Sequence, residues 1–333
     1  MAMVGRMKAV QCVQWGPPES LVLGEVPDPS PGAGEVLLDI HACAVNFPDV
    51  LLIQNLYQMK PTLPFIPGSE IGGVVRQLGE GVTNVAVGDQ VFVSSNTFGG
   101  MAEMAVMPAS DCVVVPDGVD LVHAAAFMYG HGTSYHALSD RAHLKPGEFL
   151  LVLGAAGGVG LAAVELGALM GARVIAAASS DEKLALCRKH GAEFTINYAT
   201  EDLKTRIREL TNNHGADVIY DAVGGPFSEP ALRSIALNGR FLVIGFAAGD
   251  IPKLPLNLTL LKECQVIGVF WGNYVRRSPE LNQRNVDFLM DNLKAGKLSP
   301  YVSAAFPLER ASEAFRQLAD RKAQGRVVVT VER

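Results

Sequence analysis

Hydrophobic and polar positions alternate differently in the two parts of the chain. Over the first 120 residues, short runs rich in β-branched residues are separated by Gly- and Pro-containing turns, which is typical of strands joined by tight connections. We expect such strands at residues 7–15, 21–26, 35–45, 71–78, 90–94 and 112–115. This part of the chain is predicted to form a compact, mostly antiparallel β domain.

From about Leu121 onward, apolar strands alternate with helical segments. Strands are expected at residues 149–153, 173–178, 194–196, 218–220, 241–244 and 265–270, and the helices between them include 181–190, 201–211 and 228–237. This alternation predicts an α/β domain with a parallel, doubly wound sheet covered on both faces. The segment from Gly272 to Arg333 returns to helices and β-like stretches such as 325–331, and we expect it to pack on the first domain.

One predicted strand, Phe149–Leu153, runs into a glycine-rich turn, Ala155-Ala-Gly-Gly-Val-Gly160, and then into a helix. Backbone N–H groups and the positive end of a helix bind a dinucleotide pyrophosphate at such a turn. Ala155 stands at the first position of the G-x-G-x-x-G pattern, which Ala tolerates only if no positive φ is needed there. A purely structural turn is the alternative, but the flanking strands and a helix closed by Gly171 favour nucleotide binding.

Length and charge narrow the classes of function. A chain of 333 residues predicts two domains. The formal charge of −6, with no basic run longer than Arg276-Arg277, argues against nucleic acid or an anionic membrane as partner. The glycines within the apolar stretch Leu150–Met170 favour a strand and helix over a membrane span. Without a signal-peptide core or a C-x-x-C pair, we expect a cytoplasmic protein with reduced thiols.

The end of the second strand of this domain indicates the type of cofactor. NAD-binding folds usually carry Asp or Glu there for the ribose hydroxyls. Here Ser179 and Ser180 occupy the position, and Lys183 follows. Two hydroxyls and a cation suit a 2′-phosphate, which a carboxylate would repel. The same residues can instead serve only as a capping box for the next helix. The nearby Asp181 leaves NAD as an alternative cofactor, but the absence of an acidic residue at the strand end favours NADPH.

Several motifs together resemble the medium-chain dehydrogenase/reductase superfamily, and more narrowly its zinc-independent quinone oxidoreductases, the zeta-crystallin group and its relatives. The resemblance covers nearly the whole chain. It rests on Asn46-Phe-Pro-Asp49, Asn55-Leu-Tyr57, Pro67-Gly-Ser-Glu70, the turn at 155–160, the segment 215–225 and Gly325-Arg-Val-Val-Val. It implies a GroES-like catalytic domain over residues 1–125 and 270–333 and a Rossmann-type NADP-binding domain over 126–269.

The chain departs from the superfamily's zinc-dependent members at the metal positions. Those members use a Cys near Asn46 and Gly-His-Glu where this chain has Gly68-Ser69-Glu70, and Asn and Ser are poor ligands for tetrahedral Zn²⁺. We therefore expect no metal. Glu165 and Ala168 also depart from the family's glycine-turn signature, which has Gln at the first position. Both lie on the helix beyond the turn, so we expect altered helix packing and retained cofactor binding.

The resemblance places the nicotinamide between the domains. Together with the turn and the strand-end residues, it implies cofactor contacts from Thr133, Ala156, Gly157, Gly158, Val159, Ser179, Ser180, Lys183, Tyr198, Gly245, Phe246, Phe270, Trp271, Gly272 and Arg326. Two assignments have alternatives. Thr133 can instead serve only its local turn, and Trp271 either forms an aromatic wall for a flat acceptor or packs in the core.

The expected reaction is hydride transfer from NADPH to quinones or other α,β-unsaturated carbonyl compounds. Asn46 is a candidate for orienting the nicotinamide ribose or an acceptor oxygen, and Tyr57 for donating a hydrogen bond or proton. Tyr57 is equally consistent with an amphipathic residue at the edge of a Pro-rich loop. One alternative is a reductase of enoyl or acryloyl thioesters or 2-haloacrylates. Another is a cofactor-binding structural or RNA-binding protein of the zeta-crystallin type.

The last predicted strand of the second domain, residues 265–270, bears on the oligomeric state. We expect it at the edge of the sheet, where an exposed apolar strand is prone to aggregation unless it is paired. Pairing with the same strand of a second copy would give a two-fold homodimer with a continuous sheet.

Overall fold

The computed structural model describes residues 5–94 and 98–332. Two compact units emerge: one comprises the chain up to Tyr129 together with the segment from Ser299, and the other comprises Gly130–Leu298. The boundaries expected from the sequence lay at 125/126 and 269/270. Helices α9 (Trp271–Arg277) and α10 (Pro279–Lys294) therefore fall in the second unit and not with the C-terminal tail.

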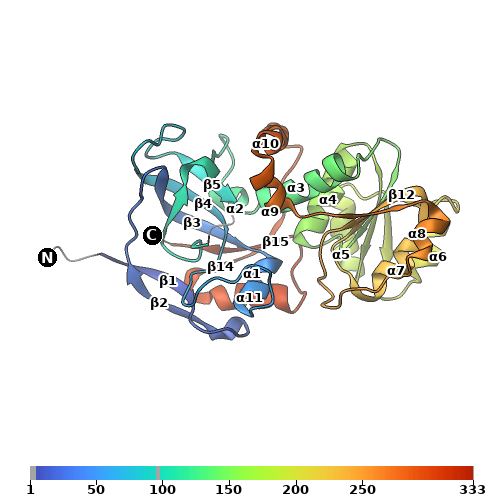
Figure 1. Ribbon diagram of the computed structural model, residues 1–333, viewed down its shortest axis with the longest axis horizontal. Helices are drawn as coiled ribbons and strands as arrows, with labels where there is room; N and C mark the ends of the chain where they lie inside the picture. Colours follow the sequence, from blue (N-terminus) through green and yellow to red (C-terminus); the bar gives the residue numbers. More distant parts are fainter. Residues whose placement is uncertain (1–4, 95–97, 333) are drawn as a thin grey trace. The chain divides into compact units, whose positions relative to one another are not determined.

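The first unit is built on a β-hairpin and a larger sheet (Figure 1). Strands β1 (Arg6–Cys12) and β2 (Leu21–Pro27) form the hairpin. The sheet has the order β14-β15-β3-β4-β5-β7, with β6 also pairing β3. Its strands are β3 (Glu35–Val45), β4 (Glu70–Leu78), β5 (Gln90–Ser94), β6 (Met104–Pro108), β7 (Cys112–Val114), β14 (Val302–Pro307) and β15 (Arg326–Thr330). Only β14 and β15 pair in parallel, so the mostly antiparallel β domain is confirmed.

Strand β6 did not emerge from the sequence pattern. Its residues, Met-Ala-Val-Met-Pro, contain a single β-branched side chain, and it becomes a strand because it pairs along half of β3. The first expected strand, 7–15, ends early, at Cys12.

Helices of the first unit are α1 (Phe47–Ile53), α2 (Leu121–Ala125) and α11 (Ala311–Ala319). Asn46 and Asp49 form a capping box at the start of α1, where Pro48 is also favourable. Helix α1 packs against α11, so an N-terminal and a C-terminal segment lie side by side (Figure 1). The C-terminal segment thus contributes both a helix and the strands β14 and β15 to this unit.

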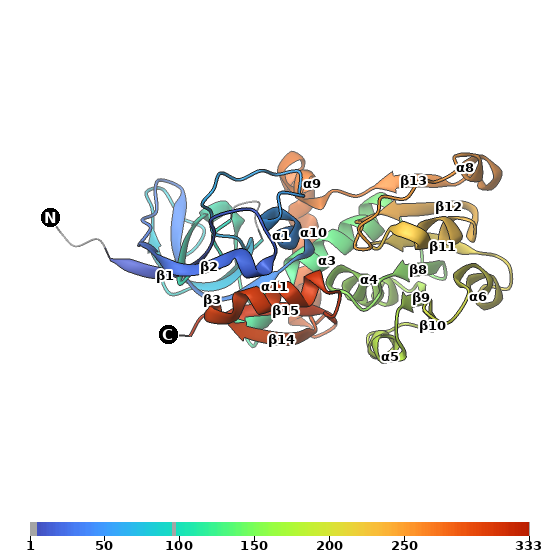
Figure 2. The ribbon, with the colours of Figure 1, turned by 90° about the horizontal axis from the view of Figure 1, so that it is seen from below.

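The second unit contains a parallel sheet of order β10-β9-β8-β11-β12-β13 (Figure 2). Its strands are β8 (Phe149–Leu153), β9 (Arg173–Ala178), β10 (Phe194–Asn197), β11 (Ala216–Asp221), β12 (Ile235–Val243) and β13 (Gln265–Gly268). Every strand predicted for this domain is present, and the sheet is doubly wound. β13 lies at the edge, as predicted.

Besides α9 and α10, which follow the last strand, the second unit contains α3 (Met128–Tyr135), which precedes the sheet and continues into the π-helical turn η3 (His136–Arg141). The helices between the strands are α4 (Gly158–Leu169), α5 (Asp181–Lys189), α6 (Leu203–Leu210), α7 (Ser228–Leu232) and α8 (Asn257–Lys262). A short 3₁₀ turn in this unit occupies Gly225–Phe227, and three more in the first unit occupy Pro18–Ser20, Ala109–Asp111 and Leu308–Arg310.

Several expected boundaries in this unit were wrong, among them the start of β12, which was expected at 241 and lies at Ile235. The helix expected over 228–237 ends at Leu232, because Ile235 already pairs with Ala216 at the start of β12. The strand expected over 265–270 ends at Gly268, because Trp271 begins α9.

The stretch Leu150–Met170 forms most of β8, the glycine turn and α4, as predicted. Among residues 5–94 and 98–332, no helix combines the length and apolar character that spanning a bilayer requires. Each of the five cysteines is a free thiol.

Candidate active site

The glycine-rich turn follows β8 directly. Gly154 adopts a positive φ of 68°, so the strained conformation falls on this residue and Ala155 is tolerated at the next position. A Cβ atom on Gly160 would lie 2.2 Å from the carbonyl oxygen of Gly154, so the backbone of α4 packs directly on the turn. The first N–H groups of α4 have no partners within the helix, and with the helix dipole they suit a pyrophosphate.

The residues expected to contact the phosphates differ in exposure. The side chain of Ala156 is buried, so any contact from this residue would come from its backbone. Gly157, which caps α4, Gly158 and Val159 are each partly exposed. The turn therefore offers backbone to a ligand, as a dinucleotide site requires.

Serine hydroxyls and a lysine follow β9. The Oγ of Ser180 accepts a bond from the backbone N–H of Lys183 at 3.4 Å, and thereby caps α5. The Nζ of Lys183 lies 3.5 Å from the Oγ of Ser179. One carboxylate oxygen of Asp181 accepts a bond from the amide of Asn197 at 2.9 Å. The geometry brings two hydroxyls and a cation together, while Asp181 is held by a neighbouring strand.

Tyr198 is the first residue after β10 and lies near these serines. Asn197 pairs with Ala178 in the parallel register of β10 and β9, so Tyr198 and Ser179 follow at the same edge. The ring of Tyr198 lies 4.4 Å from that of Phe227. Tyr198, Ser179 and the glycine turn therefore share the carboxyl edge of the parallel sheet, where ligands bind in this architecture.

Helix α3 adjoins the glycine turn. The Oγ of Ser134 donates to the carbonyl oxygen of Val159 at 2.9 Å and also pairs with the hydroxyl of Tyr220 at 2.9 Å. A Cβ atom on Gly130 would lie 3.2 Å from the carbonyl oxygen of Gly158. Thr133 is buried beside them, at 9 % exposure. Thr133 was the expected cofactor contact of this segment, whereas Ser134 makes the direct bond to the turn.

The remaining expected cofactor residues of this unit follow β12 and β13. Gly245 and Phe246 come after β12, and a Cβ atom on Gly224 would lie 2.9 Å from the ring of Phe246. Phe270 is 47 % exposed, and Trp271, the first residue of α9, is buried at 8 %. These segments lie at the carboxyl edge of the same sheet as the glycine turn.

Glu165 explains one departure from the family pattern. Its carboxylate accepts bonds from His131 at 2.9 Å and from His190 at 2.7 Å. Burial by itself would raise the pKa of Glu165, but the two histidine bonds outweigh it and hold the pKa below its usual value. The carboxylate thus connects α4 to α3 and to the end of α5.

The first unit contains a cluster of buried polar side chains, Asn46, Asp49, Glu70 and Arg326, which we call the buried polar cluster. Their exposed fractions are 3, 3, 0 and 6 %. One guanidinium nitrogen of Arg326 donates to Asn46 at 2.9 Å, and the other pairs with Glu70. Asn46 donates to the same carboxylate at 3.1 Å, and its backbone N–H donates to Asp49 at 2.7 Å.

This arrangement limits what Asn46 and Arg326 offer to a ligand. Both ends of the Asn46 amide already have protein partners, which restricts the contacts that its side chain can make to a ligand. Arg326 is a component of a buried ion pair, and its Nε has no hydrogen-bond partner among the described residues. Asp49 and Glu70 were not among the expected site residues. They belong to two motifs that lie apart in the sequence, so nothing in the sequence indicated that both carboxylates lie beside Arg326.

Tyr57 adjoins this cluster through Tyr129. The backbone N–H of Tyr129 donates to Glu70 at 2.7 Å, and the hydroxyl of Tyr129 hydrogen-bonds that of Tyr57. Burial, and then the charge of Asp49, raise the pKa of Tyr57. Burial also raises the pKa of Asp49 to about 7. Tyr57 is therefore a protonated phenol at neutral pH, which is the form that can donate a proton.

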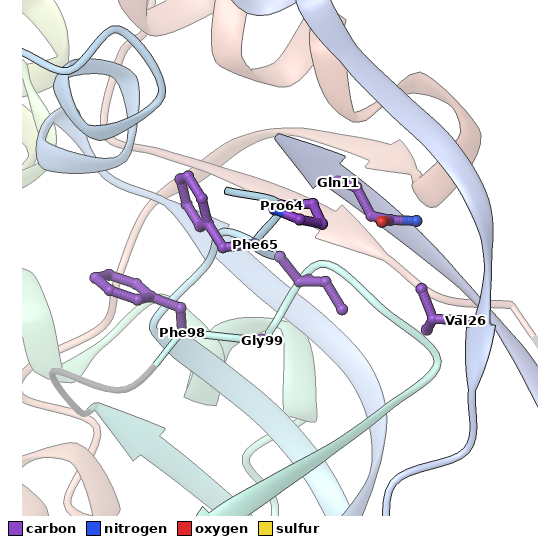
Figure 3. A pocket seen from close by; sticks show the side chains of 7 residues that line it. Gln11, Val26, Pro64, Phe65, Phe98 and Gly99 are labelled. Atoms are coloured by element: carbon purple, nitrogen blue, oxygen red, sulfur yellow. The ribbon is translucent and has the colours of Figure 1, made fainter. Parts of the chain in front are cut away.

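An apolar hollow of about 470 Å³ also lies in the first unit (Figure 3). Its walls include Phe65 and Phe98, whose rings are 5.9 Å apart, with the Gln11 amide at its rim. None of the expected site residues lines it. Throughout residues 5–94 and 98–332, no group of three or more His, Cys, Asp or Glu side chains is arranged to hold a metal ion.

Comparison with known proteins follows the same division of the chain. Residues 32–117 match the family model described as alcohol dehydrogenase GroES-like domain, and residues 158–289 match the one described as zinc-binding dehydrogenase. The quinone oxidoreductase-like protein 2 homolog of Nematostella vectensis is 40% identical, over 98% of this chain and 89% of its own.

The chain is also similar to solved structures of quinone oxidoreductases. The quinone oxidoreductase of Pseudomonas syringae pv. Tomato DC3000 is 31% identical with a TM-score of 0.90, covering 97% of this chain and 99% of its own. The Escherichia coli quinone oxidoreductase, solved with NADPH, is 28% identical with a TM-score of 0.89, covering 98% and 99%. The fold, the carboxyl-edge site and these similarities together show that the chain belongs to the quinone oxidoreductase family of the medium-chain dehydrogenase/reductase superfamily and is an oxidoreductase.

Proposed function

We propose that this oxidoreductase transfers hydride from NADPH to quinones or other α,β-unsaturated carbonyl compounds, without zinc. The observation that carries the cofactor assignment is the end of β9, where Ser179 and Lys183 lie together and no carboxylate occupies the strand end. NADPH supplies the hydride. The E. coli relative was solved with this cofactor, and related proteins are named quinone oxidoreductases, which supports the same choice here.

The residues of this chain act by binding and positioning. The turn at Gly157 and Gly158 holds the pyrophosphate, and the hydroxyls and lysine after β9 hold the 2′-phosphate. The segments at Gly245–Phe246 and Phe270–Gly272 hold the nicotinamide end and exclude water. Asn46 and Ser69, at the metal positions of zinc-dependent members, are poor zinc ligands, which supports a reaction without that metal.

Replacing Lys183 by Ala tests the cofactor choice. We expect the KM for NADPH to rise about tenfold or more, because a charge-assisted contact contributes about 1.5–3 kcal/mol, while the KM for NADH stays nearly the same. Steady-state oxidation of both cofactors with an ortho-quinone gives the comparison. Lys189→Ala, at the other end of α5, is the matched control. A wild-type preference for NADH would contradict the assignment.

Tyr57 is proposed to donate the proton that follows hydride transfer. The change Tyr57→Phe keeps the ring but removes the hydroxyl, so kcat is expected to fall about 10²-fold or more, with little change in the KM for NADPH. Tyr301→Phe, an exposed tyrosine of the same unit, serves as control. If kcat of Tyr57→Phe equals that of the wild type with both a quinone and an enone, another group donates the proton.

We also propose a homodimer formed through β13. This strand lies at the edge of the sheet, and Val266 on it is 46 % exposed. Leu260 and Leu261 of the preceding helix α8 are exposed as well. The wild type is expected at twice the chain mass of 35.4 kDa. Val266→Asp would place two carboxylates near the two-fold axis, so this variant is expected at the mass of a single chain. Light scattering after gel filtration measures this. Leu237→Asp, exposed on β12, is the control, and a monomeric wild type would refute the proposal.

A further inference from the structure

The helix formed by α3 and η3 contacts two parts of the expected cofactor site through consecutive residues. Ser134 bonds the glycine turn at Val159. The next residue, Tyr135, stacks on Phe288 of α10, with ring centroids 4.4 Å apart and planes 14° apart. His136 then stacks on Tyr274 of α9 at 3.9 Å and 20°. One short segment thus connects the phosphate turn to the α9–α10 pair.

A partly buried hydrogen-bond network, in which the Asp140 side chain is 29 % exposed, reinforces the contact of His136 with Tyr274. The Nδ1 of His136 bonds the Asp140 carboxylate at 2.7 Å, and the amide of Asn285 donates to the same carboxylate at 2.8 Å. The amide nitrogen of Asn285 also lies 3.5 Å from the hydroxyl oxygen of Tyr274. This hydroxyl forms a hydrogen bond with the Asp140 carboxylate as well. We call His136, Asp140, Tyr274 and Asn285 the Asp140 cluster. His136, Tyr274 and Asn285 are 4, 9 and 7 % exposed.

Asp140 is charged at neutral pH. Burial alone would raise its pKa, but the hydrogen bonds from His136 and Asn285 outweigh burial and lower the pKa of the carboxyl. Charge-assisted bonds of this kind are shorter and stronger than neutral ones. The cluster also lies where the helix changes to π-helical bonding at His136, and π-helical turns are frequently found at functional sites.

Tyr274 lies in the first turn of α9, three residues after Trp271, so whatever holds Tyr274 also holds the start of this helix. The start of α9 is the Phe270–Gly272 segment, which the proposed function assigns to the nicotinamide end. A displacement of about 1 Å at such a segment is enough to slow a reaction about 10²-fold, because hydride transfer needs close alignment of donor and acceptor.

We propose that the Asp140 cluster positions the Phe270–Gly272 segment relative to the glycine turn, with His136 and Asp140 as positioning residues for hydride transfer. The inference rests on the proposed function in one respect, namely that this segment binds the nicotinamide. The turn holds the phosphates, the α3–η3 segment sets the spacing, and α9 carries the residues that face the ring.

Two substitutions at His136 each remove one of its two contacts, either the hydrogen bond to Asp140 or the stacking on Tyr274. His136→Phe keeps an aromatic ring over Tyr274 but loses the bond to Asp140, and His136→Asn keeps a donor near the position of Nδ1 but loses the ring. His214→Asn is the control, because His214 forms an exposed His–Asp pair of 2.8 Å with Asp217 in the same unit. Circular dichroism and thermal unfolding identify which variants are folded.

The readouts are kcat with an ortho-quinone, the Kd of NADPH, the Kd of 2′,5′-ADP and the fluorescence lifetime of the bound nicotinamide. In both His136 variants we expect kcat to fall about tenfold and the lifetime to shift toward that of free NADPH, since the ring is held less firmly. Affinity for 2′,5′-ADP should stay within about twofold, because its contacts lie at the turn and α5. The control should match the wild type in all four.

Folded His136 variants with wild-type kcat and wild-type nicotinamide lifetime would overturn the inference. A fall in 2′,5′-ADP affinity equal to the fall in NADPH affinity would also overturn it, since that pattern indicates general loosening of the unit. A wild-type protein that binds NADPH but reduces no acceptor would instead refute the proposed function. In that case the lifetime comparison still decides the positioning role, because it needs no acceptor.

Discussion

Replacement of Arg326 by Leu is expected to lower the free energy of unfolding by about 3–5 kcal/mol, because it leaves buried carboxylates without their cation. Arg326 is the positive member of the buried polar cluster, where it pairs with Glu70 and bonds Asn46. Glu70 is fully buried and Asp49 is 3 % exposed, so water cannot take over the role of the guanidinium. Chemical denaturation followed by circular dichroism measures the loss.

The loss should depend on pH with a definite sign. Burial already raises the pKa of Asp49 to about 7, and the charge of Arg326 opposes that rise, so removing Arg326 raises the pKa further. A carboxyl whose pKa is higher in the folded than in the unfolded state favours folding less as pH rises above about 4. Arg326→Leu is therefore expected to be less destabilised at pH 5 than at pH 8.

A surface pair provides the control for this prediction. Arg310→Leu breaks the ion pair with Glu313, whose two side chains are 56 and 51 % exposed, and exposed pairs contribute about 0–1 kcal/mol. Equal losses in Arg310→Leu and Arg326→Leu, or a deficit that is larger at pH 5, would contradict the account of the buried polar cluster.

Gly160→Ala is expected to weaken NADPH binding on the order of a hundredfold, which corresponds to losing one or two charge-assisted contacts of about 1.5–3 kcal/mol each. The new Cβ would lie 2.2 Å from the carbonyl oxygen and 2.9 Å from the carbonyl carbon of Gly154. Both are backbone atoms, so the turn must move away from α4. The N–H groups that face the pyrophosphate then lose their common direction.

Isothermal titration with NADPH measures this effect, and thermal unfolding shows whether the variant keeps its fold. Gly268→Ala, in the same unit, adds the same methyl group with nothing within 4 Å of it, so it should bind NADPH like the wild type. Wild-type affinity in folded Gly160→Ala would show that the turn does not hold the phosphates.

The fold followed from the sequence wherever local pattern and pairing agree. Most parallel strands of the second unit are apolar runs between turn residues, so β8, β9 and β10 emerged with nearly correct bounds, whereas β12 begins six residues before the expected start. Strand β6 and the end of α7 did not, because pairing with β3 and β11 decided them against weak local preference. The boundary near Leu298 was likewise set by contacts of α10, such as Phe288 on Tyr135, which no local pattern encodes.

By itself the sequence determined the two-part architecture, the dinucleotide turn and the hydroxyl-and-lysine end of β9, because each depends on residues close together in the chain. Only the tertiary structure decided which distant residues meet. Arg326 reaches Glu70 and Asn46 across more than 250 positions, and Asn285 reaches Asp140 across 145. Such contacts arise from the register of strands and the packing of helices, and these depend on the whole chain at once.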